Sequence, residues 1–84
     1  MSHTVEFETR AKKEFFKLSR DMQKLLAAVI DDLSNNPRPA GAKKLIGQEG
    51  YRVRQGNYRI LYTVHDKIKT MRIYRIGNRK DVYR

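Results

Sequence analysis

The spacing of hydrophobic and polar positions changes along this chain, and each change predicts a different kind of element. Near the start, Val5 and Phe7 alternate with polar neighbours, which is the period of a half-buried strand. Between about residues 9 and 36, apolar positions recur every three or four residues, as in helices that bury one face. Alternation returns after residue 50, so strands are expected again in the second half of the chain.

Two helices are expected in the middle segment. Thr9 is a candidate N-cap for the first helix, on which Ala11, Phe15 and Leu18 share a face. Ser19 is a candidate N-cap for a longer second helix, which should end at Asn35-Asn36-Pro37 because the residue before proline avoids the α region. The apolar stripe of the second helix comprises Met22, Leu25, Leu26, Val29, Ile30 and Leu33. The two nearly contiguous helices predict a helical hairpin whose stripes belong to the core.

The remaining segments predict a loop followed by three strands. Residues 37–49 are expected to form the loop, with Leu45 and Ile46 as its apolar anchor. A hairpin then turns at Gln55-Gly56-Asn57, and a last strand runs from Ile68 to Ile76 before Gly77-Asn78 ends it. This order predicts an α+β fold in a single domain, residues 1–84. Both helices should pack on one face of a four-stranded, mostly antiparallel sheet.

Arginines fall on the side of the predicted hairpin that faces away from its apolar residues. Tyr51 and Val53 should point to one face, whereas Arg52, Arg54 and Arg59 should point to the other. The guanidinium group is always charged and its planar fork fits phosphate oxygens. Arginines on a solvated strand face would show the same alternation, so the hairpin alone leaves both interpretations open.

The distribution of charge favours a polyanion as a binding partner. The 84 residues carry a net charge of +10. Residues 1–39 contain seven basic and six acidic side chains, whereas residues 40–84 contain twelve basic and three acidic ones. A field concentrated on one half is typical of nucleic-acid binding, although an acidic protein partner also fits. An anionic membrane is disfavoured, since no predicted helix is both strongly basic and amphipathic.

The composition excludes several other classes of protein. No cysteine is present, so neither disulfides nor thiolate metal sites are available. No apolar run approaches the roughly 20 residues of a membrane span, and no signal peptide is recognisable, so a soluble cytoplasmic protein is expected.

The sequence contains no familiar catalytic motif. A glycine-rich phosphate loop, an HExxH motif and a cysteine nucleophile are all missing. The few acidic residues lie mostly on the helices, so neither a metal nor another cofactor is expected. His3 lies near the terminus and His65 beside a turn, positions typical of structural histidines. The remaining candidates for phosphate chemistry are Arg52, Arg54, Arg59, Arg79 and Tyr83.

Three segments together resemble the RelE/ParE superfamily of bacterial and archaeal toxins. They are the run Tyr-Arg-Val-Arg-Gln-Gly-Asn-Tyr-Arg-Ile-Leu-Tyr, the upstream Asn-Asn-Pro-Arg-Pro with Lys44-Leu45-Ile46-Gly47, and the ending Ile-Gly-Asn-Arg-Lys-Asp-Val-Tyr. The order of elements also matches. The resemblance implies the toxin of a type II toxin–antitoxin pair, with an acidic RelB-like antitoxin as its partner. In the RelE branch the toxin cleaves mRNA in the ribosomal A site without a metal. Because this sequence has no plausible metal-binding cluster, we expect the nucleophile to be the ribose 2′-OH of the substrate, whose attack leaves a 2′,3′-cyclic phosphate.

The resemblance also implies roles for individual residues. Arg59, Arg79 and Tyr83 occupy the positions of the catalytic arginines and the C-terminal tyrosine. Arg52 and Arg54 match basic residues that bind RNA, and Lys43 and Lys44 are expected to help them. Two departures bear on proton transfer. Some relatives have Lys at the positions of Arg52 and Arg54, and many have His at the position of Asn78. Arginine is a poor proton donor or acceptor, so the general acid and base stay unassigned.

The sequence therefore predicts a ribosome-dependent mRNA endonuclease toxin that needs no metal. Two alternatives stay open: an inhibitor of DNA gyrase, as in the ParE branch, and a basic module that binds RNA or an antitoxin without catalysis. The retained Arg79 and Tyr83 favour the endonuclease over the gyrase inhibitor.

Overall fold

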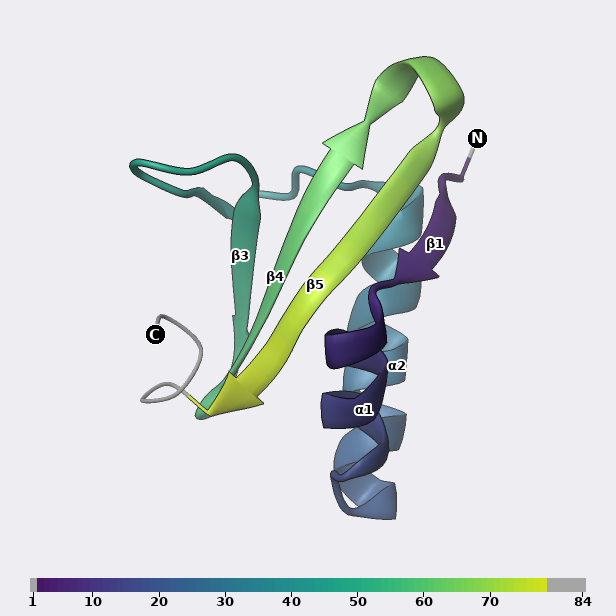
Figure 1. Cartoon of the computed structure of the whole chain (residues 1–84), viewed down its shortest axis with the longest axis vertical. Helices are drawn as coiled ribbons and strands as arrows, with labels where there is room; N and C mark the ends of the chain where they lie inside the picture. The colour runs from purple at the N-terminus through teal and green to yellow at the C-terminus, as the bar shows by residue number, and fades with distance from the viewer. Residues whose placement is uncertain (1, 79–84) are drawn as a thin grey trace.

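A single twisted sheet, covered by two helices, forms the part of the chain described by this computed structural model, residues 2–78 (Figure 1). The strands are β1 (Thr4–Phe7), β2 (Lys43–Lys44), β3 (Tyr51–Gln55), β4 (Tyr58–His65) and β5 (Thr70–Asn78); the helices are α1 (Thr9–Phe16), α2 (Arg20–Asn35) and the 3-10 turn η1 (Asp66–Ile68). The order across the sheet is β1-β5-β4-β3-β2. β1 runs parallel to β5, and the other neighbours are antiparallel. The predicted α+β class is confirmed.

The described sheet has five strands instead of the predicted four. The additional strand, β2, lies inside the predicted loop and pairs Lys43 with Arg52 and Lys44 with Tyr51. Two residues are too few to show a period-2 pattern, so the sequence gives no signal for this strand. The expected apolar anchor in this loop is also wrong for Ile46, whose side chain is 99% exposed.

The last strand begins and ends later than its hydrophobic pattern predicts. Asp66–Ile68 form η1, and Lys69 follows with a φ of 51°. Gly77 and Asn78, which were expected to end the strand, pair with Arg59 and Tyr58 of β4. Pairing with the neighbouring strand therefore extends β5 through residues that have weak strand propensity of their own.

The N-cap predicted from the sequence is confirmed for α2 but not for α1. The Ser19 hydroxyl accepts a hydrogen bond from the N–H of Met22 at 3.2 Å, which confirms it as the cap of α2. At α1 the N-cap is Glu8 and Thr9 is already helical. α2 ends at Asn35, one residue before the Asn36-Pro37 step, as predicted. Within residues 2–78, no helix is both long and apolar enough to cross a membrane.

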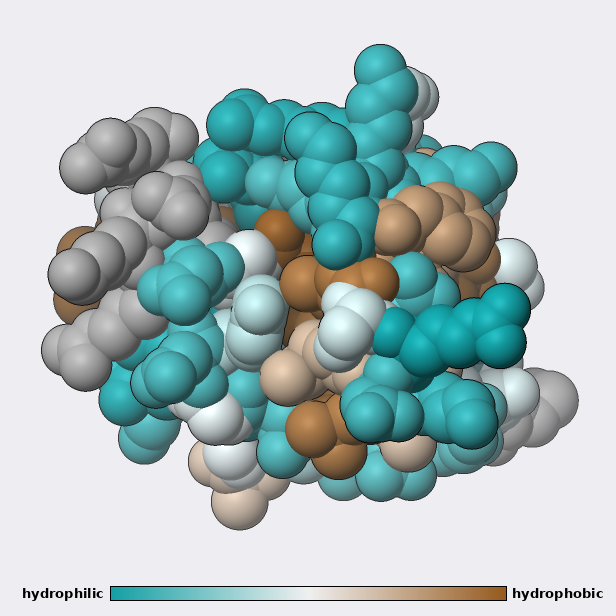
Figure 2. All heavy atoms as spheres, turned by 90° about the horizontal axis from the view of Figure 1, so that it is seen from below, coloured by the Kyte–Doolittle hydropathy of each residue, from teal (hydrophilic) through white to brown (hydrophobic). Residues whose placement is uncertain are grey.

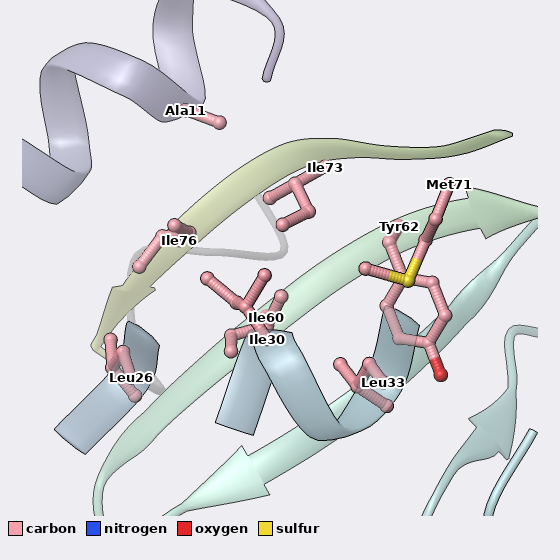
Figure 3. Packing of buried hydrophobic residues seen from close by; sticks show 9 residues of the cluster. All are labelled: Ala11, Leu26, Ile30, Leu33, Ile60, Tyr62, Met71, Ile73 and Ile76. Carbon is pink, nitrogen blue, oxygen red and sulfur yellow. The ribbon is translucent and has the colours of Figure 1, made fainter. Parts of the chain in front are cut away.

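The core lies between α2 and the central strands β4 and β5 (Figure 3). Nine buried apolar side chains form it: Ala11, Leu26, Ile30, Leu33, Ile60, Tyr62, Met71, Ile73 and Ile76. Leu25, which the sequence placed in the core stripe of α2, is outside this cluster and is 43% exposed. Because the helices cover one face of the sheet, residues that alternate with Ile60 and Tyr62 on β4 point to the other face.

A bulge in β5 changes which of its residues enter the core. Tyr62 pairs with Ile73, but Leu61 pairs with Arg75, which leaves Tyr74 as an extra residue between the two pairs. The shift brings Ile76 opposite Ile60, where simple alternation from Ile73 would have placed Arg75. The core thereby gains an isoleucine at a position that the period-2 pattern does not indicate.

Helix α1 takes the place of a strand beside the second half of β5. β1 ends at Phe7, and beyond it the carboxylate of Glu14 accepts a hydrogen bond from the Ile76 N–H at 2.9 Å. The same carboxylate accepts a bond from Nε of Arg75 at 3.1 Å, and the Arg75 side chain is only 9% exposed. One side chain of α1 thus satisfies a backbone group at the sheet edge and a buried cation.

Gly50, just before β3, supports the first testable prediction. Its φ is 111°, and a Cβ built on it would lie 2.5 Å from the carbonyl oxygen of Tyr62. We expect Gly50→Ala to lower the free energy of unfolding by roughly 1–3 kcal/mol, since both backbone strain and overlap oppose it. Urea denaturation would measure the change. Gly41→Ala is the matched control, because a Cβ at Gly41 meets nothing within 4 Å; equal losses in the two variants would contradict this reading of Gly50.

Candidate nucleic-acid interface

The register of β3 and β4 places the predicted arginines on the sheet face that the helices leave uncovered. Val53 pairs with Ile60, which belongs to the core. Arg54 lies opposite Arg59, and Arg52 lies opposite Leu61, so these pairs point to the other face. We call this surface the open face and define its basic part as Lys43, Arg52, Arg54 and Arg59.

The two lysines of β2 point to opposite sides of the sheet. Lys43 pairs with Arg52 and therefore joins the open face, whereas Lys44 pairs with Tyr51 and points to the helix-covered side of the sheet. Both lysines are exposed. RNA binding by both lysines stays a prediction, and because adjacent residues of a strand point in opposite directions, the two would act from opposite sides of the sheet.

Arg54 and Arg59 face each other directly across the hairpin. Like charges in this position are destabilising, and an anion between the two strands would stabilise both guanidinium groups. Their exposure differs: Arg54 is exposed, whereas Arg59 is only 3% exposed. A phosphate can therefore contact Arg54 directly, but it reaches Arg59 only after the groups that cover Arg59 have moved.

The far half of the open face carries a different set of side chains. Arg72 is opposite Thr63 and forms an ion pair with Glu6 of β1 at 3.2 Å, so its charge is balanced. His65 contacts the Thr63 hydroxyl at 3.0 Å. Six residues of strand separate His65 from Arg59, which is a distance of roughly 20 Å. His65 is therefore too far away to exchange a proton at a phosphate that Arg59 holds.

Arg38, which follows α2, ties three parts of the molecule together. Its Nε donates to the Tyr51 hydroxyl at 2.9 Å, and its guanidinium carbon lies 5.4 Å from the centre of the Tyr51 ring. The same guanidinium binds both carboxylate oxygens of Asp66, at 3.3 and 2.9 Å, and His3 contacts that carboxylate as well. The Asn-Pro-Arg-Pro motif marked this residue in the sequence, but nothing there indicated its partners. Arg38 holds the start of β3, and hence Arg52, in place.

The two tyrosines beside Arg38 have structural roles. Tyr51 and Tyr62 stack with ring centres 5.9 Å apart, and the Tyr62 hydroxyl donates to the carbonyl of Pro37 at 2.6 Å. Burial raises the pKa of Tyr62 to about 12. A hydroxyl that is buried, engaged and reluctant to ionise is a poor choice for proton transfer.

Two of the predicted catalytic residues, Arg79 and Tyr83, lie outside the described residues. β5 ends at Asn78, which pairs with Tyr58, so the last described residue is at the Arg59 end of the open face. Across residues 2–78, no three His, Cys, Asp or Glu side chains converge as they would to hold a metal ion. The chemistry available on the described part of this face is the binding and stabilisation of negative charge.

Comparisons with known proteins agree with the arrangement of these elements. Residues 5–83 match the family model described as ParE toxin of type II toxin–antitoxin system, parDE. The chain is similar to Toxin RelG of Mycobacterium tuberculosis, with 36% identity over 91 residues that cover 100% of this chain and 99% of the relative.

Two solved toxin–antitoxin complexes contain chains of the same fold. In the intact E. coli RelBE complex, the matching chain has a TM-score of 0.82 and 25% identity, over 92% of this chain and 96% of that one. In the RelBE2 complex from Mycobacterium tuberculosis, the values are 0.73 and 34%, over 94% and 100%.

The Arg38–Asp66 pair generates a prediction about pH. Hydrogen bonds from Arg38, and then from His3, hold the pKa of Asp66 below its ordinary value of about 4. Because the pKa of Asp66 is lower in the folded state than in the unfolded state, the ionised carboxylate stabilises the protein above about pH 4. This contribution disappears as the pH falls through the pKa of Asp66 in the folded state. We therefore expect Asp66→Asn to lower the thermal unfolding midpoint at pH 7 and to lower it less at an acidic pH below about 4.

A second variant separates this ion pair from a general effect of charge. Asp32 is exposed and forms no ion pair among the described residues. Asp32→Asn should leave the midpoint nearly unchanged at both pH values. The assignment fails if Asp66→Asn lowers the midpoint by the same amount at pH 7 and at that acidic pH.

Proposed function

This chain belongs to the family of ParE toxins of type II toxin–antitoxin systems, within the RelE/ParE superfamily, and we propose that it cleaves mRNA on the ribosome. The observation that carries the proposal is the directed placement of Arg52, Arg54 and Arg59 on the open face. A sheet face built to attract phosphate fits an RNA substrate, and toxins of the RelE family are generally endoribonucleases.

An antitoxin is the expected protein partner. The similar chains of known structure include toxins bound in RelBE complexes. We propose that the partner of this chain is acidic and that it covers or distorts the open face, because the basic half of the chain supplies a complementary field. Such binding should weaken as the salt concentration rises.

In the proposed reaction, the ribose 2′-OH of the substrate is the nucleophile. Its oxygen forms a bond to the adjacent phosphorus while the bond from phosphorus to the 5′ oxygen breaks. The 2′-OH loses its proton to a base and the departing 5′ oxygen gains one, so the products are a 2′,3′-cyclic phosphate and a 5′-OH. No metal enters these steps, and the contribution of the protein is positioning and charge stabilisation.

We assign the residues to these steps as follows. Arg59 and Arg79 would bind the oxygens of the reacting phosphate, whose charge increases in the transition state. Tyr83 would stack on the base and share in proton transfer. Arg52, Arg54 and Lys43 would guide the RNA across the open face, with Lys44 acting from the other side of β2. Because Arg59 is 3% exposed, its role requires that substrate binding uncovers it.

Replacement of Arg79 tests the mechanism. Loss of one preorganised donor lowers the rate of the chemical step by about 10²–10³. In single-turnover reactions on programmed ribosomes, the Arg79→Ala variant should therefore cleave mRNA at least that many times more slowly than the parent protein. The circular dichroism spectrum and antitoxin affinity should change little. Arg72→Ala is the matched control: it removes the same charge from the same face, but at a residue already paired with Glu6. Unchanged cleavage by Arg79→Ala would refute its assignment.

The ends of the product provide an independent criterion. Enzyme treated with EDTA and enzyme loaded with metal should cleave at the same rate, in a buffer that preserves the Mg²⁺ of the ribosome. The fragments should carry a 2′,3′-cyclic phosphate and a 5′-OH. Fragments with a 5′-phosphate and a 3′-OH would require a different nucleophile and would exclude the proposed reaction.

Inhibition of DNA gyrase is the second candidate, because the matching family model is that of ParE toxins. Brief induction in cells separates the two functions. Primer extension should reveal new mRNA ends if the chain is an endonuclease. Intact mRNA together with accumulated gyrase–DNA cleavage complexes would instead favour the ParE activity.

A further inference from the structure

The helical hairpin carries a concentration of positive charge that is not evident from the nearly neutral composition of the first half of the chain. Residues 1–39 are almost neutral, yet six of their seven basic residues fall between positions 10 and 24. All six are exposed, and Arg10 lies 4.0 Å from the Glu14 carboxylate. The other five lie on α1, on α2 or at the turn between the helices: Lys12, Lys13, Lys17, Arg20 and Lys24. We call this set the hairpin cluster. It adds a basic surface on the helical side of the sheet, away from the open face.

The hairpin cluster lacks counter-ions among the described residues. Ion pairs hold Arg38, Arg72 and Arg75, whereas no described carboxylate lies within 4.0 Å of any cation in the cluster. Glu14 is the acidic residue of α1, but it is committed to Arg75 and to the Ile76 N–H. The only other acidic residue between positions 10 and 24 is Asp21, so the cluster presents a net positive field.

Helix stability does not account for all of these cations. Lys13 and Lys17, like Arg20 and Lys24, are four residues apart, a spacing at which like charges destabilise a helix by a few tenths of a kcal/mol. Arg20 is the first residue of α2, where the helix dipole favours an anion. The dipole explains basic residues at the end of α1, but it cannot explain Arg20. A binding role accounts for a charge that the fold itself disfavours.

The hairpin cluster borders a shallow hollow with an aromatic wall. Arg20 and Lys24 line a depression of about 340 Å³ together with Phe15, Gln23 and Ala27. Seen from the end of the molecule at which α1 gives way to α2, hydrophilic side chains dominate the surface and surround a smaller hydrophobic area (Figure 2). The β3–β4 turn lies toward the same end (Figure 1). A ligand as large as a folded RNA is therefore able to contact both the helical hairpin and the β3–β4 turn at this end of the molecule.

We infer that the hairpin cluster is a second RNA-binding surface, which contacts the phosphate backbone of structured RNA without reading its sequence. Phosphates would lie against the cations, and the hollow beside Phe15 would accept one sugar or base edge. The choice of RNA as the polyanion rests on the proposed function. The charge and the geometry of the hairpin cluster are observed independently of that function. The open face would remain free to hold the strand that is cleaved.

The test compares two variants with the same net charge. Lys17→Gln/Lys24→Gln removes two cations of the cluster and keeps good helix formers. Lys67→Gln/Lys69→Gln removes two exposed lysines from the β4–β5 connection, at the opposite end of the molecule. The probe is a short labelled RNA duplex, whose binding is measured by fluorescence anisotropy over a series of salt concentrations. Each lost phosphate contact should reduce the slope of log K against log salt by about one.

We expect the cluster variant to lose about two units of slope and the control to lose less than about half a unit. Equal losses would mean that only net charge matters, and the inference would be wrong. It would also be wrong if the cluster variant bound RNA normally and instead lost affinity for an acidic antitoxin. A chain that cleaves no mRNA would refute the proposed function, but the duplex titration would still decide this inference.

Discussion

The structure depends on one constraint: within residues 2–78, both long helices lie on the same face of the sheet. α2 provides Leu26, Ile30 and Leu33, which pack on the apolar side of β4 and β5. Every residue that alternates with that side is left on the open face. The same period-2 geometry that builds the core therefore aligns Arg52, Arg54 and the buried Arg59 on one side of the sheet, where Arg54 is accessible to a large anionic ligand.

Polar side-chain contacts stabilise the sheet at places where the pairing of its short strands ends. At one edge, Glu14 replaces the missing continuation of β1 and satisfies both a backbone N–H and the buried guanidinium of Arg75. At the other end, Arg38 joins the loop after α2 to Tyr51 and Asp66. Neither contact involves the basic residues of the open face, yet both help to place its strands. Such supporting contacts keep a binding surface in one geometry without occupying it.

The placement of charge suits the large partners that we propose for this small toxin domain. Cations that take part in the fold, such as Arg38, Arg72 and Arg75, are paired with carboxylates. The described cations of the hairpin cluster are not paired, and their repulsion is a cost to the free protein. An acidic antitoxin on the open face and structured RNA at the helical hairpin would each neutralise part of this charge. The two partners need not compete for the same residues.

The sequence alone determined the class of fold, the helical hairpin, the cap at Ser19 and the face on which the arginines lie, because each follows from local periodicity and capping. The superfamily was also recognisable from the segments that carry those arginines. Only the tertiary structure decided the two-residue strand β2, the bulge at Tyr74, the burial of Arg59 and the partners of Arg38 and Glu14. These features depend on contacts between residues far apart in the chain, and a pattern that repeats every two or four residues carries no information about such contacts.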